Sequence, residues 1–327
     1  MNDDKSSTTA GDSSRWEAAT QLLKPLGPVA ANFSVAVRTL LSYHERDTPI
    51  LSAGAQNHIL RLLRNNTVKA TYYYATKAYR PHLLQQATPI KSKDFLAMYT
   101  PLEHAVLLAY CYLFRSLAKK SSKEEWEYVQ SPLYEALEIG ACIGSRVAAI
   151  GLGVGLLSRG MRYLAFAPFL ISDGKAFVQY RRHLSSKDLP FDVAREIELW
   201  GCSSIQIAAL LMESIGFNRS LAMQFVAAAE GNKLLPPDAR YGVPFRFAEA
   251  LLESYMERGE MHETLPVSTG VSMTLTFSND ERMSLLSELG KVIGSTERIE
   301  WLNKGGGSIN PSSSPELFSQ DVETIGG

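Results

Sequence analysis

The feature that most constrains the fold is a helical pattern of apolar residues that runs with few interruptions from Arg15 to about Arg258. Within it, apolar side chains recur at spacings of three and four, as at Val106, Leu107 and Tyr110, which places them on one face of a helix. Short connections join the predicted helices, as in a compact bundle. From residue 123 onward these helices cover about 123–150, 152–170, 172–184, 193–200, 203–215, 218–230 and 244–258. We therefore predict an all-α, multi-helix bundle.

Cap residues mark several helix ends. Thr100, Pro101 and Glu103 predict a helix start, because threonine is a good N-cap, proline fits the first turn, and a carboxylate at the third position completes a capping box. The pair Asn65-Asn66 is expected to cap the end of one helix, and Pro81 to break the next one.

The pattern changes after Pro266. Apolar and polar residues alternate over 271–277, which predicts a half-buried strand. Ser278 to Glu281 then form an N-cap with an acidic first turn, and the following helix continues to Ile293. A second strand is expected over 296–302. We predict a small C-terminal α/β appendage, β-α-β-like, over 263–302, which is either an accessory or interaction element or one that merely packs on the helical body.

Both ends of the chain have compositions typical of disorder. Residues 1–14 are rich in Ser, Thr and Asp, and residues 303–327 are rich in Gly, Ser and Pro. The predicted helical domain therefore covers residues 15–262, followed by the appendage.

Charge and cysteine content exclude some classes of protein. The chain has 33 Lys and Arg against 34 Asp and Glu, a net charge of −1, whereas broad binding to nucleic-acid phosphates needs a basic excess. The three cysteines are widely separated and form no Cys-x-x-Cys pair, which fits a reducing cytosol. We expect a cytoplasmic protein that does not bind nucleic acid.

No membrane span or secretory signal is expected. The first fourteen residues are polar and acidic, unlike a signal peptide. The most apolar stretch, 139–157, is interrupted by Ser145 and Arg146, and its unbroken part is too short to cross about 30 Å of hydrocarbon. We interpret it as a buried helix.

Patterns typical of catalysis or metal binding are weak. The six histidines form no His-Glu-x-x-His motif, and there is no Gly-x-Ser-x-Gly elbow. We therefore expect no metal, no cofactor and no enzymatic activity. The alternative is a metal-dependent phosphohydrolase with displaced ligands, for which Glu103, His104, His183 and Glu196 are the residues to test.

Three features have both a functional and a plainer interpretation. Cys202 lies at a predicted helix start, where thiols become more acidic, but a structural role is favoured. Gly151, Gly153 and Gly155 resemble a phosphate loop, yet their spacing fits neither common motif, so close helix packing is favoured. A basic patch and an aromatic cluster are candidate RNA or acidic-ligand contacts, although a solvated helix face and a core edge are favoured: Arg181, Arg182, His183, Lys187 and Tyr72-Tyr73-Tyr74.

Arg159 and Arg162 are the candidate anion-binding residues. They lie three positions apart, on one face of a predicted helix, which suits bidentate phosphate contacts. The chain would then be a sensor that binds an anionic nucleotide. The favoured alternative is a pair of solvent-exposed surface charges.

Two segments resemble signature elements of HDOD domains, bacterial regulatory relatives of the HD phosphohydrolases. In the segment 191–217 the matching residues are Glu198, Trp200, Gly201, Ala208 and Leu210-Leu211. In the segment 154–169 they are Gly155, Leu156, Leu157 and Gly160. Earlier segments, 48–63, 67–84 and 102–118, follow the family's order, with Arg80 where the family tends to carry Asp. The resemblance covers about residues 48–232.

Several family positions differ in this chain. Ser158 and Ser204 stand where relatives often have His, and Arg159 stands where an Asp would follow. The His-Asp dyad of the HD enzymes is therefore missing, and Arg159 would repel a divalent cation. The resemblance implies an HDOD-like bundle that acts as a non-catalytic regulatory module in bacterial signal transduction. Its expected partner is a protein such as a response regulator, a kinase or a second-messenger enzyme.

Overall fold

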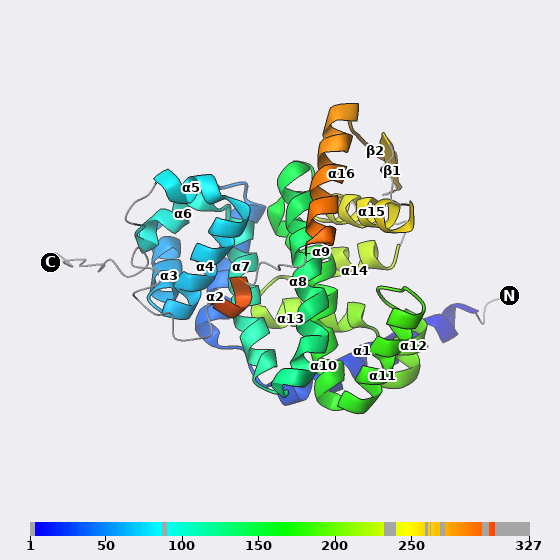
Figure 1. The fold of residues 1–327 in the computed structure, drawn as a ribbon. Helices are drawn as coiled ribbons and strands as arrows, with labels where there is room; N and C mark the ends of the chain where they lie inside the picture. Colours follow the sequence, from blue (N-terminus) through cyan, green and yellow to red (C-terminus); the bar gives the residue numbers. More distant parts are fainter. Residues whose placement is uncertain are drawn as a thin grey trace. The chain divides into compact units, whose positions relative to one another are not determined.

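The computed structural model describes residues 4–86, 90–231, 240–258, 261, 263–268, 272–295 and 301–304. The chain forms two compact units, a larger one from residues 1–28 and 116–298 and a smaller one from residues 29–115 and 299–327 (Figure 1). Helices make up most of the described structure, which confirms the predicted all-α, multi-helix fold. The boundaries of these units differ from those of the predicted domain 15–262. The chain enters the smaller unit at residue 29, leaves it after residue 115 and returns to it at residue 299.

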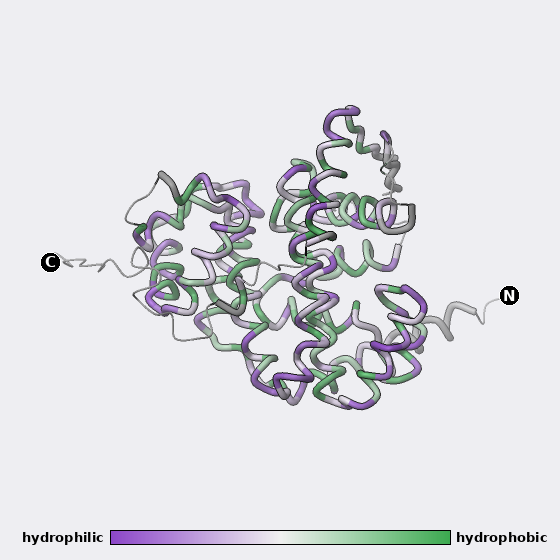
Figure 2. Tube along the Cα trace, in the orientation of Figure 1, coloured by the Kyte–Doolittle hydropathy of each residue, from purple (hydrophilic) through white to green (hydrophobic). Residues whose placement is uncertain are grey.

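The larger unit is a helical bundle with the appendage attached. Its helices before the appendage are α1 (Asp4–Leu23), α8 (Lys123–Arg146), α9 (Leu152–Leu164), α10 (Phe166–Ser172), α11 (Gly174–Ser186), α12 (Val193–Trp200), α13 (Ser204–Ile215), α14 (Arg219–Ala229) and α15 (Gly242–Arg258). Polar and apolar residues alternate along most helices (Figure 2), the pattern expected of helices with one buried face.

Two helix boundaries in this unit differ from the prediction. The helix expected over 152–170 is divided into α9 and α10, and Pro168 falls in the first turn of α10, where a missing N–H costs nothing. Residues 4–14, expected to be disordered, belong to α1. Helix α1 packs against α13 and α10 and buries Ala19, and a helix propagates readily from a packed segment.

Glycines bring α8 and α9 together. A Cβ on Gly144 or Gly155 would overlap backbone atoms of the other helix. The interpretation of these glycines as packing residues is therefore confirmed for Gly155, whereas Gly151 has a φ of 76° at the start of α9 and a Cβ there would contact nothing. The described helices include none that is long and apolar enough to cross a membrane.

The smaller unit contains the helices of the first third of the chain and one C-terminal turn. These are α2 (Ala31–Glu45), α3 (Ala53–Leu63), α4 (Asn66–Tyr79), α5 (Pro81–Gln86), α6 (Phe95–Met98), most of α7 (Pro101–Ala118), and α17 (Trp301–Lys304). The predicted capping box is present, because Thr100 N–H donates to Glu103 and Glu103 N–H donates to the Thr100 hydroxyl. Asn65 caps the start of α4, not the end of α3, since its side chain accepts from Thr67 N–H.

The C-terminal appendage is a hairpin followed by a helix. Strands β1 (Thr264–Ser268) and β2 (Ser272–Thr276) pair antiparallel, with Val267 opposite Met273. The predicted strand and the predicted helix are both present, the latter as α16 (Asn279–Gly294), which packs against α8. The predicted β-α-β order is wrong. The predicted strand, β2, pairs with β1, which precedes it in the chain. Antiparallel strands can be joined by a tight hairpin, so no crossover helix is needed.

The second strand expected over 296–302 is also wrong where the structure describes it. Residues 301–304 form the helical turn α17, and Trp301 and Leu302 are both buried. Consecutive residues of a strand point to opposite faces, whereas one helical turn buries both side chains in the smaller unit. Apart from residues 303 and 304, the expected disordered tail lies outside the described residues.

Candidate functional site

A buried carboxylate, Glu196 of α12, is the centre of a polar cluster in the larger unit. Its Oε1 accepts a 2.7 Å hydrogen bond from the Tyr180 hydroxyl, and its Oε2 accepts a 2.6 Å bond from Ser204 N–H. The Ser204 hydroxyl donates to Oε1 at 3.1 Å and accepts from Nε of Arg162 at 3.4 Å. All four side chains are buried. Both carboxylate oxygens accept, so the cluster is built around an ionised Glu196.

Local sequence positions this carboxylate. Asp192 caps α12 by accepting from Arg195 N–H, and its own N–H donates to the Tyr180 hydroxyl at 3.1 Å. Glu196 therefore lies one turn into α12. Gly201 has a φ of 74° and ends this helix in the left-handed conformation, which suits glycine. The next helix then begins at Ser204 with its first N–H directed at Glu196, and a helix N-terminus favours an anion.

The charged groups of the cluster shift one another's pKa values. Burial raises the pKa of Glu196, while the charge of Arg162 and the hydrogen bonds from Ser204 and Tyr180 oppose this shift. Burial lowers the pKa of Arg162, while Glu196 and Glu249 oppose that shift. Buried opposite charges of this kind depend on each other, because removal of one leaves the other uncompensated.

Arg159 lies on the same helix as Arg162, and both are mostly buried. The side chain of Arg159 is 12% exposed, and its Nε is 3.9 Å from Oε2 of Glu249 on α15. The guanidinium of Arg162 lies 3.6 Å from the ring centroid of Phe191. The favoured interpretation of the two arginines as solvent-exposed charges is therefore wrong, because each faces a carboxylate of its own chain. Anion binding by this pair stays a prediction.

In the smaller unit, Glu103 and His104 of α7 have structural partners. Glu103 forms a 2.6 Å ion pair with Arg80. Nδ1 of His104 lies 3.0 Å from the Tyr72 hydroxyl, and Nε2 lies 3.3 Å from the Leu96 carbonyl oxygen. Burial lowers the pKa of His104 to about 4, so this imidazole is neutral at neutral pH.

The four candidate metal ligands are divided between the two units. Glu103 and His104 belong to the smaller unit, whereas His183 and Glu196 belong to the larger one. Nε2 of His183 lies 2.9 Å from Oδ2 of Asp192, in addition to the pairings above. Within the described part of the chain, no set of three or more His, Cys, Asp or Glu residues is placed to hold a metal ion.

Most of the remaining candidates have structural positions, whereas Arg182 and Lys187 of the basic patch are exposed, as expected of a solvated helix face. Cys202 is buried, and burial raises its thiol pKa to about 12, which disfavours the reactive thiolate. In the basic patch, the guanidinium of Arg181 lies 5.5 Å from the ring centroid of Phe166, and His183 is held by Asp192. Tyr72 and Tyr73 are buried, which confirms the core-edge interpretation of the aromatic cluster.

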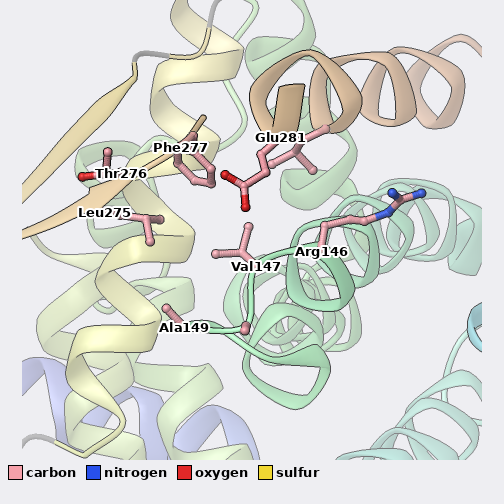
Figure 3. A pocket seen from close by; sticks show the side chains of 9 residues that line it. Arg146, Val147, Ala149, Leu275, Thr276, Phe277 and Glu281 are labelled. Carbon is pink, nitrogen blue, oxygen red and sulfur yellow. The ribbon is translucent and has the colours of Figure 1, made fainter. Parts of the chain in front are cut away.

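An accessible pocket lies where α8 meets the appendage (Figure 3). Its volume is about 270 Å³. The walls come from the turn after α8, the end of β2 and the first two turns of α16. The lining residues are Arg146, Val147, Ala148, Ala149, Leu275, Thr276, Phe277, Glu281 and Leu285.

The partners that define the buried cluster could not be predicted from the sequence. Tyr180 and Glu249 carry no motif, and they meet Glu196 and Arg159 only through the packing of separate helices. One residue of the pocket could be placed from the sequence. The predicted cap at Ser278 puts Glu281 in the first turn of the following helix.

Comparison of the chain with protein-family models, with curated proteins and with solved structures finds no match.

Proposed function

We propose that this chain is a non-catalytic, HDOD-like regulatory module of bacterial signal transduction that acts through protein contacts. The expected partner is a response regulator, a kinase or a second-messenger enzyme. The cytoplasm is the proposed location, supported by three cysteines that are all free thiols.

One observation carries this proposal: three of the four candidate catalytic residues, Glu103, His104 and Glu196, are buried and engaged in internal contacts. Glu196 is fully buried and accepts three hydrogen bonds. Glu103 is held by Arg80, and His104 is buried beside Tyr72. A catalytic group must reach its substrate within hydrogen-bond distance, and these groups are buried among side chains of their own chain.

A second candidate function, a sensor of an anionic nucleotide, is favoured by Arg159. Its Nε is buried without a hydrogen-bond partner, and its nearest carboxylate, Glu249, is 3.9 Å away. A phosphate oxygen would accept a hydrogen bond from this Nε–H. Saturating nucleotide would then stabilise the protein by about 2–4 kcal/mol, and Arg159→Gln would remove that effect.

The test is turnover and metal binding by the full-length chain. Phosphomonoester and phosphodiester substrates are assayed with Mg²⁺ and Mn²⁺ beside elemental analysis of the same preparation. The proposal predicts no turnover above buffer. Metal-dependent turnover that is lost in Glu196→Gln and kept in Glu198→Gln would refute it, because Glu198 is an exposed carboxylate on the same helix.

A further inference from the structure

The pocket between α8 and the appendage combines apolar walls with one acidic side chain. Val147, Phe277 and Leu285 are buried residues whose side chains form its walls, and Leu275 contributes from β2. Figure 3 shows the Glu281 carboxylate directed into the space between Val147 and Phe277. The site therefore offers apolar contact and a negative charge side by side.

Glu281 is held in an ionised state. Ser278 N–H and the Ser278 hydroxyl both donate to Oε2 of Glu281, at 2.9 and 2.8 Å, and these bonds lower the pKa of the carboxyl group. Oε1 takes part in neither of these two bonds. A carboxylate with one fixed oxygen is a ready acceptor for an ammonium or guanidinium group.

The arginine that lines the pocket does not pair with Glu281. Arg146 lines the pocket, but its guanidinium points away from Glu281 (Figure 3). Its Nη1 lies 3.4 Å from the Ser284 hydroxyl and its Nη2 lies 3.9 Å from Oε2 of Glu288. These residues are about one and two helical turns after Glu281. The pocket is therefore complementary to a positive ligand.

The size of the pocket is compatible with a side chain as the occupant. A volume of about 270 Å³ lies near the lower end of the range of about 300–1,000 Å³ that is usual for small-molecule sites. One apolar side chain with a neighbouring cationic group fits the walls and the carboxylate together.

We infer that this pocket is a docking site for a protein segment in which an apolar side chain stands next to a lysine or arginine. The apolar side chain lies between Val147, Phe277 and Leu285, and the cation pairs with Glu281. The inference rests on the proposed function, because it names the kind of partner segment through which the module acts.

The test uses the full-length chain and fluorescein-labelled octapeptides with a central Leu-Lys, Phe-Lys or Met-Lys pair. Each peptide has a matched partner in which Glu replaces Lys, and binding is followed by fluorescence anisotropy. We expect saturable binding of at least one lysine peptide and about fivefold weaker binding of its glutamate partner, the scale of one ion pair at a protein surface.

Three variants locate the binding. Glu281→Gln keeps the cap, since glutamine also completes a capping box, and should weaken the lysine peptide about fivefold. Ala149→Trp changes an exposed pocket residue and should abolish binding by filling the space. Glu127→Gln is the control, because Glu127 is an exposed carboxylate of α8 outside the lining, and it should bind like the wild type.

The inference is overturned if no lysine peptide binds saturably, if glutamate peptides bind equally well, or if Glu281→Gln and Ala149→Trp both bind like the wild type. Its failure is distinct from failure of the proposed function. Photo-cross-linking to a partner from exposed positions elsewhere, such as Tyr128 and Met223, would then still support regulation by contact.

Discussion

Gly140 of α8 and Gly155 of α9 face each other with no space for a side chain between their backbones. A Cβ built on either residue overlaps the carbonyl oxygen of the other. The close approach of these helices fixes the position of α9, which carries Arg159 and Arg162. Small residues at this crossing therefore connect the packing of the larger unit to its buried charged cluster.

Replacement of Gly155 by alanine should destabilise the larger unit. The added methyl group would meet the Gly140 carbonyl, and overpacking typically costs about 1–3 kcal/mol. Urea denaturation measures the effect. Gly290→Ala is the matched control, because a Cβ there contacts nothing and alanine favours the helix by about 1 kcal/mol. Equal midpoints for Gly155→Ala and the wild type would contradict the prediction.

Neutralisation of Glu196 should destabilise the protein far more than neutralisation of Glu198. Glu196→Gln removes the larger of the two negative charges that act on the buried Arg162, and breaking a buried charge pair costs about 3–5 kcal/mol. Glu198 is exposed and pairs with Arg195 at the surface, so Glu198→Gln should cost at most about 1 kcal/mol. Similar unfolding free energies for the two variants would show that the cluster is not a coupled unit.

The burial of His104 predicts a loss of stability in acid. Its pKa is lowered to about 4 in the folded chain, whereas an unfolded histidine titrates near 6.5. Stability is therefore complete above about pH 6.5 and falls as the pH is lowered towards 4, by about 3 kcal/mol for this group. His104→Gln should lose less stability over this range than the wild type. The exposed His82 supplies the control, since His82→Gln should keep the full dependence.

The short helix α17 should stabilise the smaller unit. Trp301 is buried, and its indole N–H donates a 2.6 Å hydrogen bond to the Tyr79 hydroxyl. Arg115 donates to the Leu302 carbonyl at 2.9 Å. Trp301→Ala should cost about 3–5 kcal/mol, and Tyr79→Phe about 1 kcal/mol. Thermal or urea unfolding checks both values, and an unchanged midpoint for Trp301→Ala would contradict the described packing.

The cysteines should react slowly in the folded protein. Burial raises the thiol pKa of Cys202 to about 12 and that of Cys142 to about 11, so little thiolate is present at pH 8. Iodoacetamide labelling followed by mass spectrometry should modify Cys202 only after denaturant is added. Rapid labelling of Cys202 in the native protein would contradict this prediction and show that its thiol is reactive.

The sequence predicted the helices well because their signals are local. The cap at Thr100 and the cap at Ser278 are read from residues three positions apart. The antiparallel hairpin was not predicted because β1 contains Pro266 and lacks a clear alternation of polar and apolar residues. Only its partner, β2, shows that alternation. The exposure of Arg159 and Arg162 was misjudged because helix spacing shows which residues share a face, not which carboxylates of other helices lie opposite them.

The central claim is that the chain acts by contact with a protein. Its most direct test is a photo-cross-linking residue placed singly at Ile50, Tyr128, Met223 and Thr276, all exposed positions, in the chain expressed at its natural level in its host. The account predicts discrete adducts with one and the same protein from at least one position, reproduced with the purified pair. No adduct from any position, with metal-dependent turnover by the purified chain, would contradict it.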